Sequence, residues 1–143
     1  MAEGVVDRRE IGLALALRLL EAVRSEAEPA SLAVSAAVVD RGGHVVASAR
    51  MDDAPLGAMA LAVDKAYTAI LWETPTGEFM ASTQPGGPDW GFNTTTGGRV
   101  VVYAGGLPIL EDSRLIGGLG VSGGTGEQDE ACAHAALAAA GLA

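Results

Sequence analysis

Apolar residues recur at helical spacing near the start of the chain, at Ile11, Leu15, Leu19, Ala22 and Val23. Side chains three or four residues apart share one face of a helix, so this segment is expected to be an amphipathic helix. Asp7 with Glu10 three residues later has the pattern of a capping box, and Pro29 limits the other end. The helix is therefore predicted to begin after Asp7 and to end near residues 25–28.

Five short β-rich runs are expected to be strands, at residues 32–39, 44–51, 99–103, 107–110 and 115–121. The turn residues 40–43 join the first two runs as a hairpin. Two further helices are expected, at residues 56–73 and 127–140. This order predicts an α+β fold, in which an antiparallel sheet of about five strands carries helices packed on it. At 143 residues, the chain has the length of one domain, 1–143.

The formal net charge of −9 is the wrong sign for attraction to a phosphate backbone, so nucleic acid is not an expected partner. Cys132 is the single cysteine, which excludes an internal disulfide and fits a reducing cytoplasm. Arg8 and Arg9 precede an apolar run, but charged residues continue at helical spacing through it. We therefore expect neither export nor a membrane span.

Glycines interrupt the last apolar strand at Gly117, Gly118 and Gly120. A glycine inside a strand weakens it unless a backbone or a ligand comes close. Two interpretations remain open: close packing of a helix on this strand, or the approach of a ligand.

A loop rich in glycine and hydroxyl groups follows this strand and precedes the last helix. Backbone amides at the start of a helix favour an anion, so a ligand carboxylate or phosphate is one expected occupant. Capping is expected in either case, with Ser122 or Thr125 as N-cap and carboxylates of the first helical turn complementing the dipole, and the alternative is capping alone, without a ligand. The candidate ligand-binding residues of the loop are Ser122, Gly123, Gly124, Thr125 and Gly126.

Residues 74–98 are rich in Pro, Gly, Thr and Asn, with a short helix expected at residues 77–82. A segment of this length and composition is typical of a binding loop, a lid or an interface. Trp90 and Phe92 concentrate aromatic surface here, which favours a ligand wall or a subunit contact over a plain connection.

Three segments in order resemble the GlcG/HbpS family of haem-binding-protein-like domains: residues 37–51 (AVVDRGGHVVASARM), residues 64–68 (DKAYT), and LPI followed by IGGLGVSGGTGEQDEACA in residues 107–133. With the first helix they cover nearly the whole chain. The resemblance implies a profilin-like fold, a homo-oligomer, and a small ligand, with haem or a corrinoid-linked role in some members. Haem ligands in the family are histidines, and the first helix here has none. His44 and His134 are the only candidates for that role.

Three functions remain open from the sequence. The first is a module that binds a small anionic or polar metabolite, in which Tyr67, Trp90 and Phe92 join the loop 122–126. The second is an acid/base enzyme, a lyase, isomerase or hydrolase acting on a small organic metabolite, in which Tyr67 donates a hydrogen bond. The third is haem binding, or a structural accessory role without a ligand. The candidate catalytic residues are Lys65, Glu111, Glu127 and Asp129.

Overall fold

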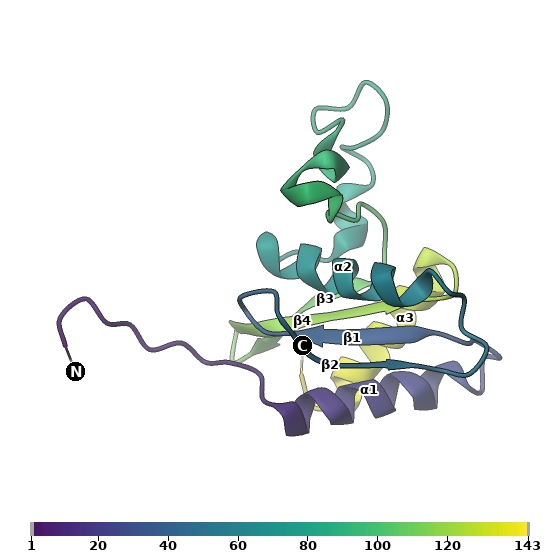
Figure 1. Ribbon diagram of the computed structural model, residues 1–143, viewed down its shortest axis with the longest axis horizontal. Helices are drawn as coiled ribbons and strands as arrows, with labels where there is room; N and C mark the ends of the chain where they lie inside the picture. Colours follow the sequence, from purple (N-terminus) through teal and green to yellow (C-terminus); the bar gives the residue numbers. More distant parts are fainter. Residues whose placement is uncertain (1, 143) are drawn as a thin grey trace.

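A computed structural model describes residues 2–142. Its centre is a four-stranded antiparallel sheet with α2 on one face and α1 and α3 on the other (Figure 1). The predicted α+β class is confirmed, with four strands in place of about five. No helix among residues 2–142 is long and apolar enough to cross a membrane. The elements are α1 (Leu13–Ala27), β1 (Ser35–Val39), β2 (Val45–Arg50), α2 (Ala58–Leu71), β3 (Gly106–Glu111), β4 (Arg114–Ser122) and α3 (Gly126–Ala139).

The strands lie in the order β2-β1-β4-β3, so β2 and β3 form the edges. Val39, the last residue of β1, lies opposite Gly118 of β4, and Ser35 lies opposite Ser122. The β1–β2 turn and the β3–β4 turn therefore meet at one end of the sheet, which we call the turn end. The loop 122–126 lies at the opposite end, where it leads into α3, and we call this the cap end.

The larger core lies between the sheet and the pair α1 and α3. Leu19 and Val23 of α1 are buried there with Leu119 of β4 and Leu137 of α3, as the apolar pattern of the first helix predicts. The start of that helix was predicted wrongly. α1 begins at Leu13 with Gly12 as N-cap and no side-chain cap.

The segment before α1 is extended because Ile11 is held against the sheet. The Ile11 amide donates to the carbonyl oxygen of Ile116 in β4 at 2.9 Å, and the Ile11 side chain is buried in the core. Asp7 consequently lies six residues ahead of the first helical residue and caps nothing. The pattern of Asp7 and Glu10 resembles a capping box, but burial of Ile11 beside β4 determines the local backbone.

On the other face, α2 lies so close to β4 that glycine is required there. A Cβ atom at Gly120 would overlap the carbonyl oxygen of Ala62, and one at Gly118 would lie 2.5 Å from that of Ala66. A side chain at either position would push the helix off the sheet. For Gly118 and Gly120, the structure therefore shows close packing of a helix. A Cβ atom at Gly117 would instead meet the carbonyl oxygen of Val39 and the side chain of Ile11.

Residues 72–98, which we call the arm, project beyond the sheet face covered by α2 (Figure 1). The arm contains three short 3₁₀ turns, η1 (Thr76–Phe79), η2 (Phe92–Thr94) and η3 (Thr96–Gly98). The short helix expected at residues 77–82 is thus a 3₁₀ turn shifted toward the N-terminus. The arm returns to the sheet through residues 99–103.

Residues 99–103, predicted as a strand, do not join the sheet. Their backbone is held by a side chain of α2: the Thr68 hydroxyl accepts a hydrogen bond from the Val101 amide at 3.0 Å and lies 3.4 Å from the Arg99 carbonyl oxygen. Val100 and Val101 are buried. The β-branched residues of this segment are therefore explained by burial against α2. A segment buried in this way has the same apolar sequence pattern as a buried strand.

Candidate functional site

Two of the predicted catalytic residues, Lys65 and Asp129, meet at the cap end as a buried ion pair. Lys65 comes from α2 and Asp129 from the first turn of α3, and their side chains are 1% and 2% exposed. The Lys65 Nζ donates to Asp129 Oδ2 and to the carbonyl oxygen of Val121, each at 2.9 Å. Two charges can remain in the interior only if they are paired and hydrogen-bonded, and here both are.

Two amides of the loop 122–126 donate hydrogen bonds to side chains of α3. The Gly124 amide donates to Asp129 Oδ1 at 2.8 Å, and the Thr125 amide donates to Gln128 Oε1 at 2.9 Å. Thr125 is the N-cap of α3 and accepts from the Gln128 amide in return, which completes a capping box. The structure thus shows the expected capping, and a ligand would have to displace these contacts to reach the two amides.

Neighbouring groups close the space around the Lys65 ammonium. The ring of Tyr103 lies 5.3 Å from Nζ, measured to the ring centroid. Gly105 has a φ of +130°, and a Cβ atom there would lie 2.5 Å from Nζ. The ammonium therefore has a carboxylate, a carbonyl oxygen and an aromatic ring around it. The arrangement ties α2, β4 and α3 together.

The other predicted site residues are dispersed. Glu127 is exposed on the first turn of α3. Glu111 lies at the turn end, where its carboxylate is 2.6 Å from the Arg9 guanidinium. Tyr67 lies beside the β1–β2 turn, with the Arg99 guanidinium 3.7 Å above its ring. The structure therefore brings Lys65 and Asp129 together and keeps the remaining candidates apart.

In the arm, the two predicted aromatic residues have different surroundings. Phe92 is half-buried against Trp72 and Phe79, whereas Trp90 is 66% exposed. The two histidines lie elsewhere on the surface. His44 is 82% exposed in the β1–β2 turn, and His134 is 64% exposed on α3. Within residues 2–142, no three His, Cys, Asp or Glu side chains are grouped as metal ligands.

A polar hollow of about 560 Å³ opens at the turn end of the sheet. We call it the arginine hollow, because four of the chain's nine basic residues line it. They come from the segment before α1, from the β1–β2 turn and from the start of β4, which the topology places at one end. The lining residues are Asp7, Arg8, Arg9, Arg41, Glu73, Ser113, Arg114 and Leu115.

The guanidinium groups of this hollow differ in how far they are neutralised. Arg9 is paired with Glu111 at 2.6 Å and lies 3.5 Å from Asp112. Arg8, Arg41 and Arg114 form no ion pair with any residue from 2 to 142. The Nε atom of Arg41 is buried and has no hydrogen-bond partner there. A buried donor without a partner is rare in folded proteins, and an anionic oxygen would satisfy it strongly.

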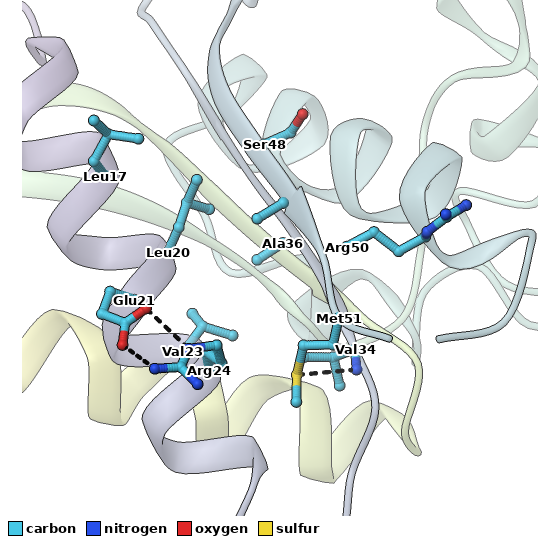
Figure 2. A pocket seen from close by; sticks show the side chains of 11 residues that line it. Leu17, Leu20, Glu21, Val23, Arg24, Val34, Ala36, Ser48, Arg50 and Met51 are labelled. Carbon is cyan, nitrogen blue, oxygen red and sulfur yellow. Dashed lines mark hydrogen bonds and ion pairs between the residues drawn. The ribbon is translucent and has the colours of Figure 1, made fainter. Parts of the chain in front are cut away.

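An open groove of about 260 Å³ runs between α1 and the edge strand β2 (Figure 2). Its walls are mainly apolar, with Leu20, Val23 and Val34 among them. At the rim, Arg24 donates to Glu21 and to Glu28, and the Glu21 carboxylate raises the pKa of the Arg24 guanidinium above its ordinary value. The positive charge at the rim is thus neutralised within the protein.

Arg50 and Met51 also line this groove. The Arg50 side chain extends away from α1 (Figure 2). The Met51 sulfur lies 3.5 Å from the Val34 amide nitrogen and accepts its hydrogen bond. The groove therefore offers apolar surface and little free charge. From the sequence, an anion site was expected at the loop 122–126, and the arginine hollow, whose arginines line the opposite end of the sheet, was not predicted.

Comparison with known proteins places the chain among related sequences. Residues 11–138 match the family described as haem degrading protein HbpS-like. A Citrobacter freundii protein described as "uncharacterized 15.0 kDa protein in dhaT-dhaS intergenic region" is 39% identical over 127 residues, 89% of either chain. Escherichia coli K12 GlcG is 36% identical over 108 residues, 76% of this chain and 78% of GlcG. The corrinoid adenosyltransferase PduO of Citrobacter freundii is 38% identical over 122 residues, which are 85% of this chain and 36% of PduO.

Solved structures agree with these relationships. The Klebsiella pneumoniae protein ORFY superimposes with a TM-score of 0.93 at 35% identity, covering 96% of this chain and 95% of ORFY. The PduOC:haem complex gives 0.89 at 35% identity, covering 94% and 97%. A double mutant of Streptomyces reticuli HbpS gives 0.87 at 28% identity, covering 97% and 92%. In sequence and in fold, the chain belongs to the HbpS-like family, which includes GlcG.

Proposed function

We propose that this protein is a small-molecule-binding domain whose ligand is a small organic anion held in the arginine hollow. Structures of relatives support the general role, because PduOC has been solved as a complex with haem. The observation that carries the anionic ligand is the group of three arginines without ion pairs, of which Arg41 has a buried, unpartnered Nε atom.

The chemistry of the hollow suits a carboxylate or a phosphate that also carries hydroxyl groups. A guanidinium presents a planar fork of donors that matches either anion in a bidentate manner. Asp7 and Glu73 line the same hollow and can accept hydrogen bonds from hydroxyl groups of the ligand, and the Ser113 hydroxyl supplies another polar contact. The local excess of positive charge stands out on a chain with a net charge of −9. A small hydroxy acid or a sugar phosphate fits this combination.

Haem, the alternative suggested by the family, does not fit the histidines of a single chain. Haem iron is held by His, Cys, Met or Tyr facing an apolar pocket. His44 and His134 are largely exposed, and Cys132 is buried in the α1–α3 core. The apolar groove of Figure 2 holds only Met51, whose sulfur already accepts the Val34 amide. We therefore propose that haem is not ligated through a histidine of this chain.

Acid/base catalysis stays a prediction that the geometry does not favour. A general acid or base must reach the reacting proton, and its usual mark is a titratable group in a pocket. Lys65 and Asp129 neutralise each other in the interior, and neither they nor Glu127 line the arginine hollow or the groove. Binding without chemistry is therefore the function proposed.

Calorimetric titration tests this proposal, with hydroxycarboxylates, phosphate esters and inorganic phosphate as probes at fixed ionic strength. At least one probe should bind and should raise the melting temperature. Arg41→Gln should then weaken it about 10- to 100-fold, the range of a lost charge-assisted hydrogen bond of about 1.5–3 kcal/mol. Arg18→Gln removes the same charge from the exposed surface of α1 and should leave affinity unchanged.

Two results would contradict the proposal. One is the absence of binding by every anion; the other is equal affinity in the Arg41→Gln and unmodified proteins. Titration with haem, followed by absorbance, separates the alternative, because a 1:1 complex with the spectrum of a histidine ligand would show the haem argument to be wrong. The predicted homo-oligomer remains a prediction, which light scattering checks directly.

A further inference from the structure

Another hollow, with different chemistry from the arginine hollow, lies at the base of the arm. It has a volume of about 200 Å³ and is lined by Trp72, Phe79, Asp89 and Phe92. We call it the aromatic pocket. Trp72 follows directly after α2, Phe79 ends η1 and Phe92 begins η2, so three separate turns of the chain each contribute one ring.

The three rings meet edge to face and form walls instead of a stack. The centroids of Trp72 and Phe92 are 6.2 Å apart at an interplanar angle of 62°, and those of Phe79 and Phe92 are 5.2 Å apart at 63°. Trp72 is 62% exposed, so it contributes little to the core. An exposed tryptophan beside two partly buried phenylalanines presents aromatic surface to whatever enters the hollow.

The charge distribution around the aromatic pocket favours a positively charged ligand. The face of an aromatic ring carries a negative quadrupole potential that attracts cations. The Asp89 carboxylate lines the same pocket and forms no ion pair or side-chain hydrogen bond with residues 2–142. The arm as a whole contains Glu73, Glu78 and Asp89 and no lysine, arginine or histidine. The negative charge of the arm would repel an anion. A cation could interact with the Asp89 carboxylate, because no basic side chain of the arm is present to pair with it.

We propose that the aromatic pocket binds a small organic cation, a quaternary ammonium or a protonated alkylamine. Three rings and one carboxylate satisfy a diffuse charge surrounded by methyl or methylene groups, which is the type of cation that aromatic cages bind. A metal ion does not fit, because a single carboxylate supplies too few oxygen ligands for Mg²⁺ or Ca²⁺. The site is separate from the arginine hollow and takes a ligand of the opposite charge.

The chain offers a direct readout of this site. It contains two tryptophans, and Trp90 does not line the pocket. In a Trp90→Phe background, the emission therefore comes from Trp72 alone. Choline chloride serves as the probe, and 3,3-dimethyl-1-butanol, its neutral isostere, serves as the control at equal ionic strength. Choline should change the Trp72 emission in a saturable way, with an affinity at least 10-fold above that of the neutral isostere.

Substitutions then distinguish the contribution of the carboxylate from that of the aromatic ring, and a fold control accompanies them. Asp89→Asn and Phe92→Leu should each weaken choline binding about 3- to 10-fold in the same background, because each removes from the pocket one group that stabilises the bound cation. Arg41→Gln, in the arginine hollow, should leave choline binding unchanged, so that failure of this site is distinct from failure of the proposed anion site. Far-ultraviolet circular dichroism verifies that each variant is folded.

Three outcomes would overturn the proposal. The first is an equal response to choline and to its neutral isostere, which would show a plain hydrophobic hollow. The second is unchanged choline affinity in Asp89→Asn and Phe92→Leu. The third is no response to choline together with Trp72 emission that depends on protein concentration, which would identify the aromatic pocket as a contact between copies of the chain.

Discussion

Breaking the buried pair of Lys65 and Asp129 should cost a large part of the folding free energy. In Asp129→Asn, the side-chain oxygen can still accept from the Gly124 amide, but the ammonium of Lys65 loses its counter-charge and faces an NH₂ group. Because both side chains are at most 2% exposed, water cannot replace the lost carboxylate. Removing one member of a buried pair costs about 3–5 kcal/mol, against a total stability of about 5–15 kcal/mol for a typical domain.

Urea denaturation followed by circular dichroism measures this loss, and thermal melting gives a second measure. For a domain of this size, each kcal/mol lowers the melting temperature by about 2–4 °C, so a loss of about 3–5 kcal/mol should lower it by about 6–20 °C. Lys65→Met should destabilise by a similar amount, since it leaves the carboxylate buried without its cation. The double variant should lose clearly less than the sum of the two single variants, because no charge is then left uncompensated.

The exposed pair of Arg9 and Glu111 provides the matched control. Their side chains are 48% and 41% exposed, and Glu111→Gln should cost less than about 1 kcal/mol. The reasoning is refuted if Asp129→Asn changes stability no more than this control does. It is refuted as well if the effects of Lys65→Met and Asp129→Asn simply add.

Three further outcomes follow from the packing. Gly120→Ala should destabilise by about 1–3 kcal/mol, because the added methyl group overlaps the Ala62 carbonyl oxygen, whereas Gly57→Ala has open space and should change stability little in the same urea assay. Ser113→Gly should stabilise by about 1 kcal/mol, because Ser113 has a φ of +62° in the β3–β4 turn, where a side chain is strained; an unchanged or lower midpoint would contradict this. Burial raises the pKa of the Cys132 thiol above its ordinary value of 9.0, so a disulfide reagent should label it slowly at neutral pH and rapidly in urea. The same shift makes the contribution of this thiol to stability complete below pH 9.0 and progressively lost as the pH rises through the raised pKa.

Local patterns in the sequence were sufficient for most elements. The hairpin at residues 32–51, the helix at 56–73 and the last helix all correspond to β1–β2, α2 and α3 within a few residues. The failures have one cause in common. At Asp7 and at residues 99–103, the backbone is determined by contacts with distant parts of the chain, namely β4 and Thr68. A periodicity rule has no access to such contacts.

The candidate site was predicted less completely, for the same reason. Lys65 and Asp129 were each singled out by residue type, but their pairing joins positions 64 residues apart and depends on how α2 and α3 meet the sheet. The arginine hollow was missed, because its members are scattered from residue 8 to residue 114. The strand order supplies what the sequence lacked: in the order β2-β1-β4-β3 both hairpin turns lie at one end of the sheet, which brings Arg41 and Arg114 to the same hollow.

Lys65 is the only lysine in the sequence, and its amine is enclosed between a carboxylate, a carbonyl oxygen and the Tyr103 ring. The folded surface consequently offers no side-chain amine to acylating reagents, aldehydes or amine-directed crosslinkers. Such reagents will spare the side chains of the native protein and will modify residue 65 only when the chain opens. Acylation at this one position thus becomes a chemical record of unfolding, readable by mass spectrometry without any engineered label.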